Sequence, residues 1–274
     1  MDLKRTYEGP IEPLVATTNR FRGVVVEPDA LPGDSELFEV QLRLSLERWA
    51  REGYRVAWLE VPIDRAALIP KATALGFVFH HSHPDRLMLT RRLQAGATIP
   101  LYATHYIGAG GLVINEVHEL LVVWERVHRH HHRKYYKLPG GALKPGEHLI
   151  DGVMREVREE TGIETRFEAL MGFRHWHGYR YDKSDIYFIC RLRPVTTDIQ
   201  VQESEIAEAK WMPIDDYLTS EYVGTFNRQM VKAAASGRGL VPGWFKAYDV
   251  SPETHEIFVP DRYRTEDNCC DRSP

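Results

Sequence analysis

Cysteine and long apolar segments are scarce in this 274-residue sequence. Its three cysteines are Cys190, inside a strand-like run, and Cys269 and Cys270, in a polar tail, and this arrangement makes no disulfide framework. No apolar run approaches the roughly 18 residues of a membrane-spanning helix, and the N-terminus lacks the apolar core of a signal sequence. We therefore expect a cytoplasmic protein with no membrane partner.

An excess of charge of one sign is also lacking. Lys and Arg number 35 against 39 Asp and Glu, and the formal net charge of −4 argues against a general nucleic-acid binder. Hydrophobic residues make up 43% and charged residues 27%, which is the balance of an ordinary globular protein. The length suggests two domains.

The most informative pattern lies between residues 141 and 163. Pro145 and Gly146 predict a turn, residues 147–161 a helix, and Gly162 the end of that helix. One face of this helix is apolar and is expected to be buried; it holds Leu149, Ile150, Val153, Met154 and Val157. Another face carries Glu156, Glu159 and Glu160. This spacing alone is compatible with a solvated acidic face or with a Mg²⁺ or Mn²⁺ site, because like charges repel but hard cations prefer oxygen ligands.

The complete spacing resembles the Nudix box of the Nudix hydrolase family. Gly141 is followed, after five residues, by Glu147 and, after seven more, by the run Arg155-Glu156-Val157-Arg158-Glu159-Glu160-Thr161-Gly162-Ile163. The resemblance implies a loop–helix–loop site that binds Mg²⁺ or Mn²⁺ and cleaves a nucleoside diphosphate joined to another group. It implies metal ligands from the carbonyl of Gly140 or Gly141 and from Glu156, Glu159 and Glu160. It also implies that Arg155 pairs with Glu147 and orients the carboxylates.

The first hundred residues predict a small α/β domain. The expected order is a strand at 21–27, a helix at 35–51, a strand at 54–61, a helix capped by Asp64 and ending at Gly76, and strands at 77–81 and 86–90. This order and the corner Ala74–Phe77 resemble the second half of a GNAT acetyltransferase, but the loop that binds coenzyme A pyrophosphate is lacking, so we expect no acetyl transfer. Such a domain before a Nudix box resembles the pre-Nudix domain of the Nudix motif 6 type, for which dimerisation or completion of the substrate site is the expected role.

Two histidine clusters have competing interpretations. His80, His81 and His83 fit either a metal site or the polar end of a hairpin, and the second is favoured because no paired ligand cluster accompanies them. The run His128–His132 fits either zinc binding or a solvated basic loop that attracts an anionic substrate, and the basic loop is favoured.

The second half of the sequence predicts further strands. Residues 102–115, interrupted by Gly108, Gly110 and Gly111, and residues 119–125 are expected to form a hairpin, the glycines marking a bulge or a close backbone approach. Strands are also expected at 166–173 and 185–192, with a loop at 174–184 between them.

That expected loop and a later one supply candidate binding residues. Arg174, Trp176, Tyr179 and Lys183 could clamp phosphates and stack on a base, a contact worth roughly 1–3 kcal/mol. Packing of Trp176 and Tyr179 against the other domain is the equal alternative. The stretch from Lys183 to Leu192 is similar to the motif 6 subgroup and to plant ADP-ribose/NADH enzymes. By the same resemblance, Glu203 or Glu205 would add a carboxylate for metal binding or as general base, with an acidic surface loop as the alternative.

We therefore expect an α/β protein: a Nudix α/β/α sandwich with a mixed sheet at 98–238, behind a GNAT-like domain at 18–94 and before an extension at 239–274. The predicted activity is Mg²⁺- or Mn²⁺-dependent hydrolysis of a pyrophosphate, most directly ADP-ribose to AMP and ribose 5-phosphate, or NADH. The catalytic residues expected are Arg155, Glu156, Glu159, Glu160 and Glu205, and those expected to contact substrate are Arg174, Trp176, Tyr179, Lys183 and Glu203. A non-catalytic nucleotide sensor is the alternative, and a homodimer is compatible with either.

Overall fold

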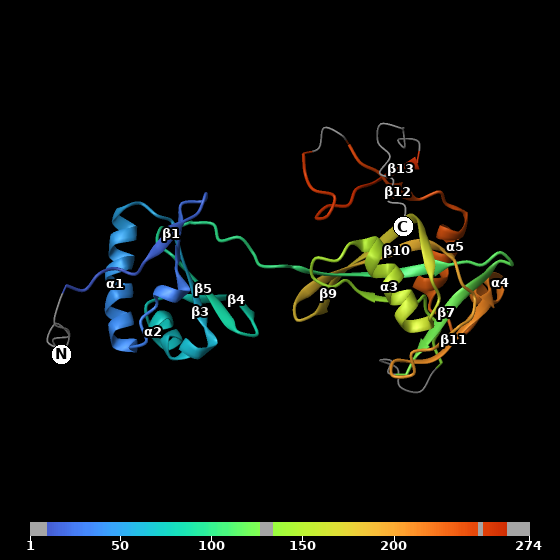
Figure 1. Ribbon diagram of the computed structural model, residues 1–274, viewed down its shortest axis with the longest axis horizontal. Coiled ribbons are helices and arrows are strands. Elements are labelled where there is room, and N and C mark those ends of the chain that lie inside the picture. The colour runs from blue at the N-terminus through green and yellow to red at the C-terminus, as the bar shows by residue number, and fades with distance from the viewer. Residues whose placement is uncertain (1–9, 127–133, 246–248, 262–274) are drawn as a thin grey trace. The chain divides into compact units, whose positions relative to one another are not determined.

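The computed structural model describes residues 10–126, 134–245 and 249–261. It forms two compact units, Met1–Ala103 and Thr104–Pro274, which are drawn in Figure 1 and described separately. The run His128–His132 and the pair Cys269 and Cys270 lie outside the described residues. Within them, every helix is too short or too polar to cross a bilayer.

The first unit is built on a five-stranded mixed sheet with the order β1-β2-β3-β5-β4. Strands β2 and β3 pair in parallel and the other neighbours pair antiparallel. The strands are β1 Ala16–Thr18, β2 Gly23–Val26, β3 Val56–Pro62, β4 Val78–His83 and β5 Arg86–Arg92. The helices are the 3-10 helices η2 Pro28–Ala30 and η3 Ile63–Leu68, and the α-helices α1 Ser35–Arg51 and α2 Ile69–Ala74. The predicted mixed α/β organisation is confirmed, while the GNAT-like identity of this unit stays a prediction.

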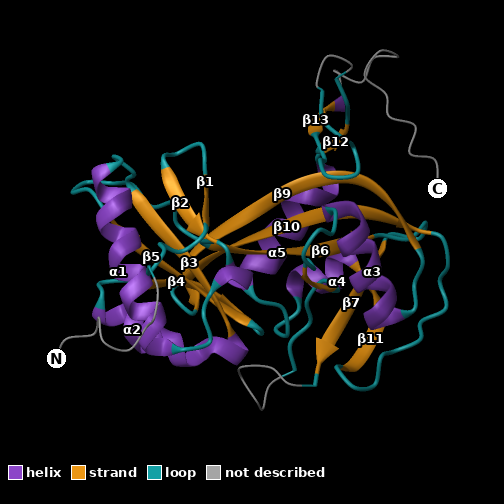
Figure 2. Cartoon of the chain, turned by 60° about the vertical axis from the view of Figure 1, so that its left-hand side comes forward, coloured by secondary structure: helices purple, strands orange, loops and turns teal. Residues whose placement is uncertain are grey.

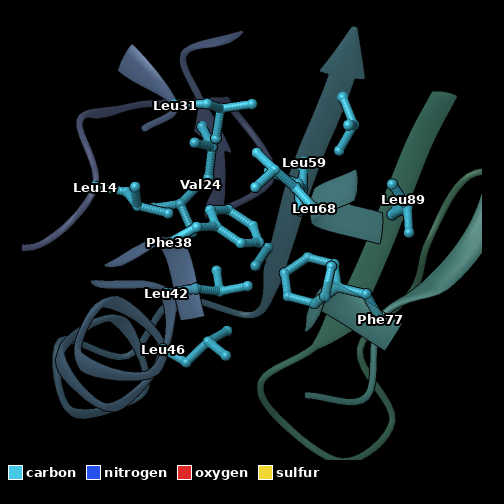
Figure 3. Close-up of a cluster of buried hydrophobic side chains, with 14 of the residues drawn as sticks. Leu14, Val24, Leu31, Phe38, Leu42, Leu46, Leu59, Leu68, Phe77 and Leu89 are labelled. Carbon is cyan, nitrogen blue, oxygen red and sulfur yellow. The ribbon is translucent and has the colours of Figure 1, made fainter. Parts of the chain in front are cut away.

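Helix α1 covers one face of this sheet and supplies much of its core. Asp34 caps the helix by accepting hydrogen bonds from the backbone N–H groups of Glu36 and Leu37 at 2.8 and 2.9 Å. Figure 3 shows Phe38 and Leu42 of α1 pointing into a cluster of buried side chains that includes Leu59 of β3 and Leu89 of β5. The helix predicted at 35–51 is therefore confirmed, and it buries the face that carries Phe38, Leu42 and Leu46.

The second helix of this unit begins later than predicted. Asp64 is not its N-cap, because residues 63–68 form the 3-10 helix η3, which follows Pro62 without a side-chain cap. The α-helix begins only at Ile69, with Pro70 in its first turn. Proline fits a first turn but not a helix interior, since it has no N–H to donate, so it sets the start of α2.

The predicted histidine hairpin end contains a stack of rings. Nδ1 of His80 lies 2.7 Å from Nδ1 of His81, and the His81 ring stacks on Tyr102 with centroids 4.3 Å apart. Burial lowers the pKa of His81, and the neighbouring rings of His80 and His83 lower it further. The imidazole of His81, stacked on Tyr102, therefore favours its neutral form.

The second unit has a six-stranded mixed sheet with the order β13-β12-β9-β10-β6-β8. Its strands are β6 His105–Val113, β8 Gly140–Ala142, β9 Thr165–Arg180, β10 Lys183–Pro194, β12 Leu240–Pro242 and β13 Phe258–Pro260. Strand β7 Glu119–Glu125 pairs separately with β11 Ile206–Pro213. The helices are α3 Leu149–Thr161, α4 Ile214–Thr219 and α5 Thr225–Ser236.

Helices cover both faces of the six-stranded sheet. Val153 and Val157 of α3 pack in one cluster with Cys190 and Leu192 of β10. Tyr217 of α4 and residues of α5 pack in a second cluster, with residues such as Leu112 of β6 and Ile189 of β10. Adjacent strand residues thus enter different clusters, because successive side chains of a strand point to opposite faces.

The hairpin predicted between residues 102–115 and 119–125 is wrong as a sheet pairing. One isolated antiparallel bridge, Ile114 with Leu120, joins the residue after β6 to β7, and among the described residues β6 itself pairs with β10 and β8. Leu120 and Leu121, which are consecutive in β7, enter the two different clusters. Both faces of β7 are therefore buried, each in one of the two clusters. Strand β7 forms its ladder with β11 and not with β6.

The loop predicted at 174–184 is also wrong. Strand β9 continues to Arg180, and only Tyr181 and Asp182 form the turn to β10, with φ of 48° and 56°. Figure 2 shows β9 and β10 side by side as one long hairpin. Two residues with positive φ form the type of turn that matches the twist of paired strands, and aspartate adopts such φ values more readily than most residues.

Candidate active site

The backbone of Gly140 and Gly141 lies very close to strand β6. Gly140 has a φ of 148°, and a Cβ added to it would overlap the carbonyl oxygen of Ala109. A Cβ added to Gly110 would meet the hydroxyl of Tyr187 at 2.6 Å. The close backbone approach predicted from the β6 glycines is therefore confirmed, and it brings β8 beside the hydroxyl end of Tyr187.

Helix α3 ends as predicted and turns one of its three glutamates inward. Gly162 adopts a left-handed φ of 73°, which stops the helix. Glu160 is only 5% exposed, and its carboxylate accepts a hydrogen bond from the N–H of Gly140 at 2.8 Å. Burial raises the pKa of Glu160 to about 7, although Lys137 opposes the shift. The three glutamates are thus not a uniformly solvated face.

Arg155 organises the remaining carboxylates. Its Nε and Nη2 bind the two oxygens of Glu147 at 2.6 and 2.9 Å, and its Nη1 binds Glu156 at 2.7 Å and Glu159 at 2.9 Å. These hydrogen bonds with Arg155 lower the pKa of Glu147 to about 2. The pairing of Arg155 with Glu147 that the box resemblance implied is present, and it ties the loop before α3 to the middle of the helix.

Glu156 is a second carboxylate beside the pair Gly140 and Gly141. A Cβ added to Gly141 would lie 2.6 Å from Oε2 of Glu156, so the carboxylate touches the glycine backbone. Glu160 contacts Gly140 on the same short strand. In the part of the chain that the structure describes, no three acid, histidine or cysteine side chains already converge as a metal site. Arg155 is bound to Glu156 and Glu159 in this arrangement.

Two residues of this site were not predicted. Nζ of Lys137 lies 2.5 Å from Glu125, 3.8 Å from Glu160 and 3.3 Å from the carbonyl oxygen of Gly140. Burial opposes the charge of Lys137, but Glu160 and Glu125 outweigh it and raise the lysine pKa. Lys137 stands three residues before Gly140, so its proximity to the box was a usable signal. No signal in the sequence indicated Glu125, because its position beside Lys137 depends on how β7 packs.

The candidate substrate residues Arg174, Trp176 and Tyr179 do lie together. The guanidinium carbon of Arg174 is 5.3 Å from the ring centroid of Trp176, and the Trp176 and Tyr179 centroids are 5.1 Å apart. Nη2 of Arg174 binds Asp185 at 2.6 Å, and its Nε is buried without a hydrogen-bond partner among the described groups. Arg174 and Trp176 share one face of β9, as residues two apart on a strand do.

This group, which we call the aromatic cluster, extends to residues that were not predicted. The Arg174 guanidinium also lies over the rings of Tyr187 and Phe226, at 5.6 and 5.2 Å from their centroids, and Tyr106 contacts Tyr179 at 6.1 Å. Tyr187 faces Gly108 and Gly110, so the aromatic cluster reaches the glycine pair. Burial raises the pKa of Tyr187 to about 12. Because residues 174–184 were predicted as a loop, the pairing of β9 with β10 was not considered. That pairing places Arg174 opposite Tyr187. Lys183 begins β10 opposite Arg180, at the turn end of the hairpin.

The candidate acids Glu203 and Glu205 are positioned differently from the box glutamates. Both are exposed, and their backbone carbonyls accept hydrogen bonds from Arg126. Among the described residues, neither carboxylate forms a hydrogen bond or ion pair with the box; the acid from outside the box that reaches Glu160 through Lys137 is Glu125. The role predicted for Glu203 or Glu205 stays a prediction.

The raised pKa of Glu160 has a consequence for stability without metal. Between pH 4.5 and pH 7 the unfolded chain releases the Glu160 proton while the folded chain retains it, so the contribution of Glu160 to the free energy of unfolding falls by about 3 kcal/mol over this range. We expect Glu160→Gln to remove this fall. Urea unfolding in a chelator at pH 5 and pH 8 measures it, with the exposed Glu164→Gln as control. Equal pH dependence of wild type and Glu160→Gln would contradict the expectation.

Comparison with known proteins connects both units to one family. A family model described as Nudix hydrolase domain matches residues 14–93, and one described as NUDIX domain matches residues 104–234. Nudix hydrolase 7 of Arabidopsis thaliana is 42% identical over 208 residues, which cover 75% of this chain and 73% of that protein. The human protein nucleoside diphosphate-linked moiety X motif 6 is 36% identical over 211 residues, covering 74% and 66%. Nudix hydrolase 8 of Arabidopsis thaliana is 37% identical over 207 residues, and the chain spans 56% of its length.

Proposed function

Because this chain belongs to the Nudix hydrolase family, as its sequence predicted, we propose that it hydrolyses the pyrophosphate bond of a nucleoside diphosphate derivative. The arrangement of the box glutamates around Gly140 and Gly141 carries this proposal. ADP-ribose, giving AMP and ribose 5-phosphate, is the first substrate to test and NADH the second. Both follow from the similarity of the stretch at 183–192 to plant ADP-ribose/NADH enzymes.

The residues of the site fit Mg²⁺ or Mn²⁺. Glu156, Glu159, Glu160 and the carbonyl of Gly140 or Gly141 would hold the ion, since carboxylate and carbonyl oxygens are the ligands that these hard cations prefer. A bound divalent ion would neutralise charge on the pyrophosphate and acidify a water. Arg155 acts on the ligands and not on the ion, because its guanidinium, held by Glu147, fixes the orientation of Glu156 and Glu159.

The protein groups contribute orientation and proton transfer. A carboxylate would accept the proton of the attacking water, and a box glutamate or Glu205 would be that base. The ammonium group of Lys137 holds Glu160 and Glu125 beside the Gly140 carbonyl and so keeps one edge of the site in place. Positioning and charge neutralisation account for most of the catalysis in phosphoryl-type transfer.

The aromatic cluster would bind the nucleoside part of the substrate. Trp176 is partly exposed and lies beside the Arg174 guanidinium, so a base could stack on the exposed part of its ring. The buried Nε of Arg174, which has no hydrogen-bond partner among the described groups, would donate to a substrate oxygen that entered the aromatic cluster. Because Tyr187 connects this cluster to Gly108 and Gly110, the base and the pyrophosphate would occupy neighbouring parts of one unit.

Product analysis tests the proposal directly. The protein is incubated with Mg²⁺ and, in separate reactions, with ADP-ribose, NADH, coenzyme A and nucleoside triphosphates, and the products are separated by HPLC. AMP formed from ADP-ribose or NADH, and abolished by a chelator, is the expected result. No turnover of any substrate, together with tight calorimetric binding of one nucleotide, would favour a nucleotide sensor instead.

We expect Trp176→Ala to raise the KM for the preferred substrate about tenfold with little change in kcat, because a lost stacking contact is worth roughly 1–3 kcal/mol. Steady-state kinetics with the product assay measure both constants. Tyr181→Ala is the matched control, since this aromatic residue belongs to the same hairpin but is 85% exposed at its turn. An unchanged KM in Trp176→Ala would place the base elsewhere.

A further inference from the structure

The C-terminal extension reaches the first turn of the helix that carries the box glutamates. One carboxylate oxygen of Glu256 accepts a hydrogen bond from the N–H of Leu149 at 2.6 Å, and the other from the N–H of Ile150 at 3.3 Å. Nδ1 of His148 lies 3.4 Å from the same carboxylate. Glu256 is 107 residues from Leu149 in sequence, and it lies beyond residues 104–234, which the family model matches.

This contact supplies a cap that the local sequence lacks. The N-cap position of α3 is His148, whose side chain makes no capping hydrogen bond. The first N–H groups of a helix have no partner inside it, and a carboxylate there is favoured both as an acceptor and by the helix dipole. With a side chain only 13% exposed, Glu256 makes this contact largely shielded from water.

A continuous series of contacts leads from this cap to the catalytic carboxylates. His148 and Leu149 directly follow Glu147 in the chain. Glu147 binds Arg155 through two hydrogen bonds, and Arg155 binds Glu156 and Glu159. Fraying of the first turn of α3 would therefore displace the residue that orients the guanidinium, and with it two of the proposed metal ligands.

The extension contacts the outer face of α3 loosely apart from this carboxylate. Strands β12 and β13 pair with each other, and β12 pairs with β9 at Leu170. A cavity of about 650 Å³ separates the extension from the helix; its lining includes Ile150, Met154, Phe167, Trp244 and Phe258. This space leaves Ile150 and Met154 incompletely covered. Among the described residues, Phe258 packs against the cluster that includes Val153 of α3, and the hydrogen bonds between extension and helix are the two made by Glu256.

We propose that Glu256 is a positioning residue for hydrolysis: it caps α3 and thereby holds the Glu147–Arg155 pair and the box glutamates in their working arrangement. This inference rests on the proposed function. It gives the C-terminal extension a role in the reaction although no residue of the extension reaches the glycine pair among the described contacts.

The test compares Glu256→Ala and Glu256→Gln with Glu253→Ala, an exposed glutamate of the same extension. Loss of an N-cap corresponds to about a threefold to thirtyfold change in an equilibrium, so we expect kcat to fall about tenfold in Glu256→Ala, with KM within twofold of wild type. Glu256→Gln keeps an acceptor oxygen and should lose about threefold in kcat. The dissociation constant for Mn²⁺, measured by electron paramagnetic resonance, should rise in the same order. Glu253→Ala should match wild type.

Hydrogen exchange of the Leu149 and Ile150 amides separates the two proposals. Faster exchange in Glu256→Ala, with weaker Mn²⁺ binding, would support the positioning role even if none of the tested nucleotides were cleaved. Unchanged exchange, unchanged kcat and unchanged Mn²⁺ affinity in Glu256→Ala would overturn it. An equal loss of kcat and of Mn²⁺ affinity in Glu253→Ala would also overturn the proposal, because the cause would then be the negative charge of the extension and not the cap at Leu149 and Ile150. If Glu256→Ala fails to fold, Glu256→Gln decides by the same measurements.

Discussion

Replacement of Glu159 or Glu160 by glutamine is expected to lower kcat for the preferred pyrophosphate substrate by about 10²- to 10³-fold, the loss typical when a group that stabilises transition-state charge is removed. Glutamine preserves shape and one acceptor oxygen but removes the negative charge that a divalent ion requires. Glu159 has an exposed carboxylate beside Arg155, and Glu160 has a buried one bound to the Gly140 N–H, so the two variants test both environments of the site. Initial rates over a range of Mg²⁺ concentrations measure the effect.

Glu164→Gln is the matched control for this prediction. Glu164 follows α3 by three residues and its side chain is 55% exposed. Among the described residues, the ion pair of its carboxylate is a 3.9 Å contact with Arg158. Its replacement should leave the rate within about twofold of wild type, since exposed ion pairs contribute little. Wild-type rates for Glu159→Gln and Glu160→Gln in Mg²⁺ would show that the box glutamates are not the metal ligands.

Replacement of Arg155 by methionine should have the largest effect on stability, lowering the free energy of unfolding by about 3–5 kcal/mol. The Arg155 side chain is 14% exposed and binds Glu147, Glu156 and Glu159. Its loss removes the guanidinium from three neighbouring carboxylates, of which Glu159 keeps a 3.7 Å ion pair with Lys144. Glu147, whose pKa is held at about 2, loses the group chiefly responsible for that low value. Chemical denaturation at pH 7 in a chelator measures the change without a contribution from metal.

Two companion variants define the cause. Arg155→Lys keeps the charge but cannot form the two parallel hydrogen bonds to Glu147, so its stability should lie between those of Arg155→Met and wild type. Arg158→Met removes an arginine from the same helix that is exposed, and it should change the free energy of unfolding by no more than about 0.5 kcal/mol. A loss for Arg158→Met as large as that for Arg155→Met would mean that general helix charge, and not the network, stabilises α3.

Whether a contact of the site could be predicted depends on how far apart in sequence the interacting residues lie. The Arg155–Glu147 pair was predicted through the resemblance to the Nudix box, which implies that these two positions pair, and the structure contains it. The inward position of Glu160 and its raised pKa could not be predicted from the sequence. Both depend on residues outside the helix, namely Gly140, Lys137 and Glu125. The loop predicted at 174–184 was wrong because nothing in the segment alone shows that β9 continues beside β10 as far as the pair of Arg180 with Lys183.

Local sequence was sufficient to predict α3 and its end at Gly162, although the helix begins at Leu149 and not at residue 147. It was also sufficient to predict the apolar face of α3, the close approach of the β6 glycines and, through the resemblance to the Nudix box, the membership of the Nudix family. These features depend on periodicity, turn chemistry and fixed spacing, which are properties of neighbouring residues. The folded chain was needed to show which acid joins Glu160, how Tyr187 and Phe226 surround Arg174, and that Glu256 caps the catalytic helix. Such contacts join segments tens of residues to more than a hundred residues apart, and they form only when packing of the whole unit fixes the distances between them.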